Sequence, residues 1–408
     1  MQQNNQHDQD KPRRLSRRSF LQAAGAAAAG FLLTSCGPGA ADESAVLPGT
    51  TATQPTVTAV PPTPAPAATA RSVTPVATKP VSSSTKVAIG KVQSYDRDLI
   101  RSTVRDMVDS LGGLSDVVSP GDRVAIKTNL TGGTGSAGQS RLDPIESYLT
   151  HPEVVRALGE LVLDAGAKEL LIVEAVYEWD SYVVWGYEDL AADLGATLID
   201  LNATDPYGDY VKVEPPGGGV IYPEYTFNPI LFDVDVFMSV AKMKCHWTAG
   251  VTHSLKNLFG LVPAKFYRLR AQDNYRSEFH GATDETAGYR VPRIIVDINT
   301  SRPINFSLID GIVTIAGGEG PWVQTYGPEA LNAGVLFAGK NPVSTDAVAT
   351  AAQGFDPSAP GMTVPFVRSD NHLELAYEAG LGTNRLDEIE VVGYAIDDVK
   401  MNFRPCVV

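Results

Sequence analysis

The chain has 408 residues and carries 33 lysines and arginines against 47 aspartates and glutamates, a formal net charge of −14. Because it shows no basic stripe or nucleic-acid-binding motif, we expect no nucleic-acid partner. An acidic protein is repelled by an anionic membrane surface, so we expect any membrane attachment to come from a lipid rather than from charge.

The first 36 residues are typical of an export signal. Residues 16–21 (Ser-Arg-Arg-Ser-Phe-Leu) form a twin-arginine pattern, and an apolar run follows at 20–34. That run is shorter than the ~20 residues of a membrane-spanning helix. Residues 33–36 (Leu-Thr-Ser-Cys) resemble a lipobox, which predicts that Cys36 is acylated and anchors the protein to the outer face of the cytoplasmic membrane. The alternative interpretation is a short membrane anchor with a chance cysteine.

Residues 37–85 are rich in Pro, Thr, Ala and Val and carry few charges. Such a segment cannot bury a core, so we interpret it as a disordered tether. The remaining residues, 86–408, are long enough for a large core. They predict either one α/β unit or two lobes, at 86–230 and 231–408.

The first half of this region alternates between strand and helix patterns. Strands are expected at 86–92, 122–127, 169–174 and 197–201, and helices after Asp96, from about residue 150 and at 187–194. Residues 128–150 form a Gly-rich loop, and residues 204–230 read as a loop or antiparallel excursion. Strand patterns return at 233–241, 306–310, 334–338 and 388–392, and a helix is expected at 343–352. The alternation predicts a doubly wound, mostly parallel sheet, with a second α/β or α+β lobe.

Polar residues crowd the segment 240–262, directly after the apolar strand at 233–241. Ligand sites of open parallel sheets lie beyond the carboxyl ends of their strands, so this segment predicts a site. Lys242 and Lys244 point to the same face if the strand continues, and like charges there require an anion or carboxylates between them. Lys256 and Asn257 precede an apolar turn and are suited to holding an anionic ligand. Solvated lysines at a strand end and a surface helix end are the alternatives.

Three further features are open to more than one interpretation. Cys245, His246 and His253 supply some zinc ligands, but their spacing fits no standard zinc pattern, so the metal stays unknown. The two cysteines outside the lipobox, Cys245 and Cys406, are too few for an iron–sulfur cluster, and they form either one disulfide or two thiols. Asp310 follows an apolar run and Glu319 lies in a Gly-rich loop; such acids serve as bases, metal ligands or turn formers.

Many ordered segments resemble the bacterial and archaeal family called domain of unknown function 362. They lie at 120–129, 151–157, 164–168, 242–246, 250–252, 255–260, 310–311, 319–321 and 339–343. Some family members carry ferredoxin-like modules, whose cysteines this chain lacks. Cys245 stands where the family pattern has Thr, and His253 lies outside the pattern. The resemblance favours nine site residues: Lys127, Asn129, Lys242, Lys244, His246, Lys256, Asn257, His280 and Asp310.

These observations lead to one functional hypothesis with alternatives. We expect an exported, lipid-anchored enzyme that acts on a small anionic substrate or uses an anionic cofactor of unknown identity. Its lysines and asparagines would hold the anion in a cleft between the lobes, and His246, His280 and Asp310 would be catalytic, with His280 and Asp310 closing the far side. The alternatives are a non-catalytic ligand- or metal-binding lipoprotein, a redox-linked protein related to the iron–sulfur members, and a purely structural protein.

Overall fold

The computed structural model describes residues 79–139, 142–322 and 328–406. The predicted signal at 1–36, with Cys36, and most of the predicted tether lie outside these residues. Residues 79–85 are described, and Lys79 forms an ion pair of 2.5 Å with Asp122. Within the described part, no helix is both long enough and apolar enough to span a membrane.

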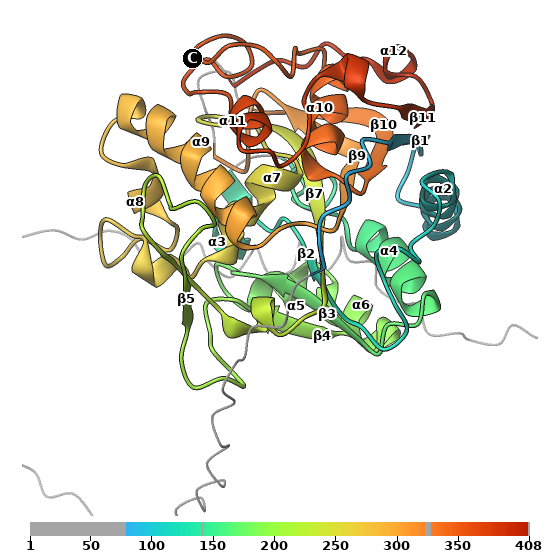
Figure 1. Ribbon diagram of the computed structural model, residues 1–408, viewed down its shortest axis with the longest axis horizontal. Helices are drawn as coiled ribbons and strands as arrows, with labels where there is room; N and C mark the ends of the chain where they lie inside the picture. Colours follow the sequence, from blue (N-terminus) through green and yellow to red (C-terminus); the bar gives the residue numbers. More distant parts are fainter. Residues whose placement is uncertain (1–78, 140–141, 323–327, 407–408) are drawn as a thin grey trace, which may run out of the picture. The chain divides into compact units, whose positions relative to one another are not determined.

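A nine-stranded mixed sheet organises the described residues (Figure 1). Its order is β11-β1-β10-β9-β7-β2-β3-β4, and the short β8 pairs with β7. Five of the neighbouring pairs are parallel and three are antiparallel, which confirms the predicted α/β class with a mostly parallel sheet. The strands are β1 (Val87–Lys91), β2 (Arg123–Lys127), β3 (Glu169–Glu174), β4 (Thr197–Asp200), β7 (Val236–His246), β8 (Gly250–Val251), β9 (Phe306–Ala316), β10 (Glu329–Gly339) and β11 (Val391–Gly393).

The first strand departs from the expected parallel pairing. β1 does not lie beside β2; it pairs antiparallel with β10 and parallel with β11. The reason is the antiparallel pair β9–β10, whose strands have 11 residues each and leave one edge of β10 open to β1. In the same sheet β7 lies between β2 and β9, so strands from both predicted lobes are direct neighbours. The lobe boundary near residue 230 stays a prediction.

Helices cover both faces of the sheet (Figure 1). Apolar residues of α2, α4 and α6 pack on one face, and those of α7, α9, α10 and α11 pack on the other. Strand residues alternate between the faces, as the two-residue period of a strand requires. The helices are α2 (Arg97–Ser110), α3 (Gly133–Ser136), α4 (Pro152–Asp164), α5 (Asp180–Val184), α6 (Tyr187–Leu194), α7 (Ser254–Asn257), α8 (Ser277–His280), α9 (Asp284–Ser301), α10 (Pro342–Ala352), α11 (His372–Glu378) and α12 (Ile396–Val399).

Helix starts follow the capping rules. Asp96 accepts a hydrogen bond from the backbone N–H of Leu99 and caps α2, as expected. The cap of α4 is His151, close to the expected helix start at about residue 150, and its side chain accepts from the backbone N–H of Glu153. The 18-residue helix α9 was not among the expected helices. It carries an internal proline, Pro292, and packs an apolar stripe of Val291, Ile294, Ile295 and Ile298 into the core.

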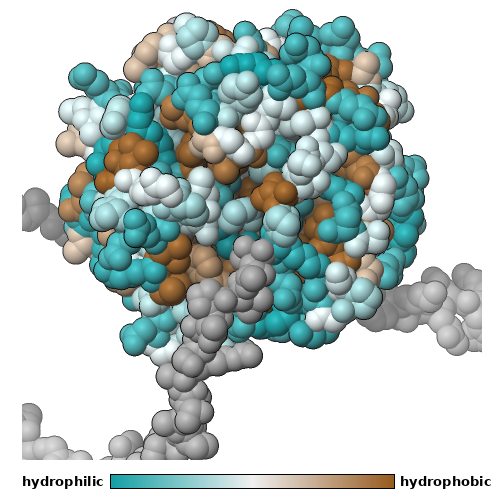
Figure 2. Space-filling view, viewed as in Figure 1, coloured by the Kyte–Doolittle hydropathy of each residue, from teal (hydrophilic) through white to brown (hydrophobic). Residues whose placement is uncertain are grey.

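The excursion at 204–230 contains a small second sheet, formed by the antiparallel strands β5 (Val211–Val213) and β6 (Tyr225–Phe227). Tyr225 and Phe227 of β6 join the core on the α9 side. The outer surface of the visible face is mixed, with apolar patches interrupted by hydrophilic residues (Figure 2).

Candidate functional site

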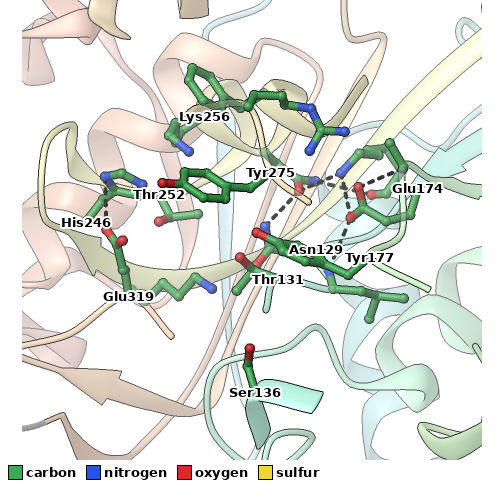
Figure 3. Close-up of a pocket in the computed structure, with 18 of the residues that line it drawn as sticks. Asn129, Thr131, Ser136, Glu174, Tyr177, His246, Thr252, Lys256, Tyr275 and Glu319 are labelled. Atoms are coloured by element: carbon green, nitrogen blue, oxygen red, sulfur yellow. Dashed lines mark hydrogen bonds and ion pairs between the residues drawn. The ribbon is translucent and has the colours of Figure 1, made fainter. Parts of the chain in front are cut away.

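A cavity of about 380 Å³ lies at the carboxyl edge of the sheet, where β2, β3 and β7 end (Figure 3). The last residue of each of these strands, Lys127, Glu174 and His246, lines it. Parallel strands bring their carboxyl ends to one edge, and the loops that follow leave a crevice there. The short helix α7 adds Lys256 and Asn257 from the segment that the sequence singled out.

Seven of the nine residues favoured by the sequence line this cavity: Lys127, Asn129, Lys244, His246, Lys256, Asn257 and His280. Sequence reasoning missed Glu174, Arg276 and the aromatic residues Tyr177, Phe259 and Tyr275. Glu174 ends a buried strand, and the strand-end rule that pointed to Lys127 applies equally to it. Arg276 lies in an irregular segment without a pattern, so only the tertiary structure reveals its place.

One wall of the cavity is a closed hydrogen-bond network. Lys127 Nζ lies 2.8 Å from Glu174 Oε2 and 3.2 Å from Asn257 Oδ1, which also accepts from Asn129 Nδ2 at 3.1 Å. Burial lowers the pKa of Lys127, while Glu174 opposes that shift. A β-carbon at Gly260 would stand 2.5 Å from Glu174 Oε1. A glycine there therefore lets the turn after α7 approach the Lys127–Glu174 pair closely. The side chains of this wall therefore hold one another in place by hydrogen bonds.

Three further cations of the lining form no ion pair with a carboxylate of the described residues. Lys244 Nζ donates to the backbone oxygen of Tyr148 at 2.8 Å. Lys256 Nζ lies 4.1 Å from the ring centre of Phe259, and no oxygen of the described residues accepts a hydrogen bond from it. Arg276 donates through Nε to Val262 O at 2.7 Å, and its Nη2 is buried without a partner in the described residues.

The charges lining the cavity are therefore unequal. Four cationic side chains, Lys127, Lys244, Lys256 and Arg276, face two carboxylates, Glu174 and Glu319. Burial lowers the pKa of Lys244 well below its ordinary value. Burial also lowers the pKa of Lys256 to about 8, with Glu319 opposing the shift and Arg276 adding to it. In a chain of net charge −14, this is a local inversion of sign.

Two histidines complete the lining. His246 Nδ1 lies 3.1 Å from Glu319 Oε2 (Figure 3). The same nitrogen lies 3.1 Å from the backbone nitrogens of Thr248 and Ala249. The amides favour a lone pair on Nδ1 and a proton on Nε2; the carboxylate favours the other tautomer. Burial, followed by the nearby Lys256 and His280, lowers the pKa of His246 well below its usual range, which favours the neutral ring. His246 can thus present either a proton donor or an acceptor.

His280 is a second proton-transfer group. Its Nδ1 lies 3.3 Å from the backbone oxygen of Arg276, and a carbonyl only accepts, so Nδ1 carries the proton and Nε2 is left as a base. Burial and then Lys256 lower its pKa. A neighbouring cavity of about 460 Å³ shares Tyr275, His280 and Glu319 with the first, so these residues lie at the boundary between the two. Tyr275 is 40% exposed and marks an opening to solvent.

Lys242 and Asp310 do not line the cavity, although the sequence grouped them with the site. They form a buried ion pair of 2.9 Å with each other. The parallel register places Lys242 directly beside Asp310, and the register shifts before Lys244. Tyr95 O–H lies 3.0 Å from Asp310 Oδ1 and 2.8 Å from Lys242 Nζ, and the backbone N–H of His151 donates to Asp310 Oδ2. Lys242 and Asp310 therefore have their charge and hydrogen-bond partners within this cluster.

The three candidate zinc ligands of the sequence point to different surroundings. Cys245 lies in the apolar core with Cys406, and both are buried free thiols. His253 Nδ1 lies 3.4 Å from Thr350 Oγ1, behind the cavity. Among the described residues, no group of three or more His, Cys, Asp or Glu side chains is placed to hold a metal ion.

Residues 124–351 match the family model described as domain of unknown function (DUF362). The match spans more than half of the chain and includes the strands and helix α7 that build the cavity, so this protein belongs to the DUF362 family.

One curated relative is a thylakoid-associated protein of Synechocystis sp. It is 28% identical over 294 residues, which are 71% of this chain and 79% of the relative. A crystal structure of a Thermotoga maritima protein aligns with a TM-score of 0.28 and 11% identity, and the alignment spans 55% of this chain and about half, 52%, of that protein.

Proposed function

We propose that this protein binds a small organic anion in the cavity and acts on it as an enzyme. The supporting observation is a set of three buried cations that form no ion pair with a carboxylate of the described residues: Lys244, Lys256 and Arg276. A buried charge without a counter-charge is costly, and a bound anion removes that cost. Inorganic ions are small for a volume of about 380 Å³, whereas organic ligands fill cavities of roughly 300–1,000 Å³.

The lining divides into parts with different tasks. Lys244, Lys256 and Arg276 supply the positive charge that attracts the anion, and Tyr177 and Phe259 contact the apolar body of the ligand. His246 and His280 have ring nitrogens available for proton transfer, which an enzyme requires and a simple binding protein does not. A non-catalytic binding protein is the second candidate, because the same cations would serve it equally well.

Thermal unfolding tests the anion site. Phosphate, nucleotides, and small mono- and dicarboxylates are titrated to millimolar concentration, and the bound anion raises the melting temperature because it binds only the folded state. Lys256→Ala abolishes the shift. Lys212→Ala, at an exposed lysine paired with Glu224, leaves it unchanged. An absence of any shift in the unsubstituted protein overturns the proposal.

Hydrogen exchange separates the enzyme from the binding protein. A carboxylate that shifts the transition is incubated with the protein in D₂O, and its carbon-bound hydrogens are followed by NMR. An enzyme that moves protons at His280 incorporates deuterium into the ligand, and His280→Gln abolishes incorporation while anion binding persists. Binding without incorporation or any other change in the ligand favours the second candidate.

We further propose that Cys36 carries a lipid that anchors the exported protein to a membrane. The lipobox pattern at 33–36 supports this, and the Synechocystis relative is named for its association with a membrane. Cys36→Ala should move the protein from the membrane to the soluble fraction and abolish labelling with a radioactive fatty acid. Cys406→Ala is the matched control and should remain with the membrane; retention of the Cys36 variant there contradicts the anchor.

A further inference from the structure

Lys256 differs from every other buried lysine of the described residues. Four of the five have an oxygen partner within hydrogen-bond distance: Lys127 with Glu174, Lys242 with Asp310, Lys244 with Tyr148 O and Lys340 with Asp116. Lys256 has only the ring face of Phe259 at 4.1 Å. An aromatic face attracts an ammonium group, but it offers no oxygen or nitrogen atom that would hold the amine in a fixed hydrogen bond.

The position of Lys256 also makes its amine reachable from the cavity. It lines the main cavity together with His280, and both lie against Phe259, whose ring centre is 5.6 Å from that of His280. Lys244 and Arg276 line the same cavity and remain available to hold a negative group. An unpaired amine, a neighbouring base and two further cations therefore line one cavity.

We propose that Lys256 is a nucleophile whose Nζ condenses with the carbonyl group of the anionic ligand to form an imine. The inference rests on the proposed anion site and narrows its ligand to a carbonyl compound with a carboxylate or phosphate group, such as an oxo acid. Lysines of this kind are desolvated and lie near other cations, which keeps part of the population as the free amine. The pKa of Lys256, lowered to about 8 by burial, agrees with that requirement.

The condensation proceeds through a carbinolamine and releases one water. The ammonium first releases a proton to His280 Nε2 or to solvent, and the nitrogen lone pair attacks the carbonyl carbon. The carbonyl π electrons pass to the oxygen, and a proton moves from the attacking nitrogen to this oxygen to give a neutral carbinolamine. Loss of the hydroxyl group, protonated by His280, releases one water and leaves a carbon–nitrogen double bond. No electrons are gained or lost overall, so the step needs no oxidant or reductant.

Reductive trapping tests the proposal. The folded protein is incubated with glyoxylate, an anionic aldehyde, and sodium cyanoborohydride, and the modified lysine is identified by peptide mass mapping. Lys256 should be modified in preference to the exposed Lys212 and Lys265. The yield at Lys256 should rise across about pH 7–9, the range around a pKa of about 8. Acetaldehyde, which lacks the anionic group, should show little preference for Lys256.

The matched variant is Lys256→Arg, which keeps the positive charge but cannot form an imine. It should retain a thermal shift with a carboxylate and lose the selective adduct, and Lys212→Arg should lose neither. A thermal shift without preferential modification of Lys256 overturns the imine and leaves the anion site standing. The absence of a thermal shift in the unsubstituted protein overturns the anion site itself, so the two failures are distinct.

Discussion

Lys242 and Lys244 lie two residues apart on β7, and both are almost fully buried, yet their surroundings are opposite. Lys242 belongs to a closed cluster in which Asp310 and Tyr95 satisfy its charge. Lys244 faces a cavity where its closest partner is a neutral backbone oxygen. A buried charge with its counter-ion is stabilised within the fold, whereas a buried lysine without one must bear the desolvation cost or release its proton.

The largest expected effect comes from breaking the closed cluster. Lys242→Met leaves the Asp310 carboxylate buried without its cation and should lower the free energy of unfolding by about 3–5 kcal/mol. Lys244→Met is the matched control on the same strand. It removes a buried charge that lacks a counter-ion, so its stability should stay equal or rise. Urea unfolding of both variants provides the comparison, and equal losses would show that the two lysines have the same role.

Lys256→Met should stabilise the protein at neutral pH. Its pKa falls from 10.5 to about 8 on folding, so the protonated lysine opposes folding, and removing it should gain roughly 1–3 kcal/mol. The destabilisation of the folded state by protonated Lys256 is fully present below about pH 8. It disappears as the pH rises toward 10.5, because the folded state loses this proton at a lower pH than the unfolded state does. Urea unfolding of both proteins at about pH 7 and about pH 10.5 measures how this difference in the free energy of unfolding changes with pH. A variant that is less stable than the unsubstituted protein at about pH 7 would contradict the unpaired state of Lys256.

The smallest effect concerns two tyrosines. Tyr95→Phe removes a hydroxyl that contacts Lys242, Asp310 and Val313, and it should cost about 1–2 kcal/mol. Tyr275→Phe, at the cavity opening, should change stability by less than about 0.5 kcal/mol, since no hydrogen bond of the described residues involves its hydroxyl. A similar cost at both positions would remove the distinction between the closed cluster and the cavity.

The sequence predicted the elements with strong local signals and the edge of the sheet where the cavity lies. The strand patterns led to β2, β3 and β7, and the polar run after β7 supplied Lys244, His246, Lys256 and Asn257. It did not predict the antiparallel position of β1, because strand order depends on which edge the β9–β10 pair leaves free.

The same limit applies to the site. Lys242 and Lys244 have the same residue type and the expected two-residue spacing, and only the register shift between them sends one to a carboxylate and the other to the cavity. Arg276 reaches the cavity from an irregular segment more than 100 residues from Glu174, a separation that local patterns cannot bridge. Pairings between distant segments, rather than local propensities, account for what the sequence left undetermined.

The route of the chain into the domain has a practical consequence for handling the protein. Lys79 pairs with Asp122, and its backbone oxygen accepts from Asn305 Nδ2. Asp122 and Asn305 lie just before β2 and β9, at the amino edge of the sheet, opposite the cavity. The C-terminal segment, by contrast, lies against β7, where Cys245 Sγ donates to Arg404 O beside His246. An affinity tag or a solid support therefore belongs at the N-terminal side of the domain, where it leaves the opening of the cavity uncovered during titrations.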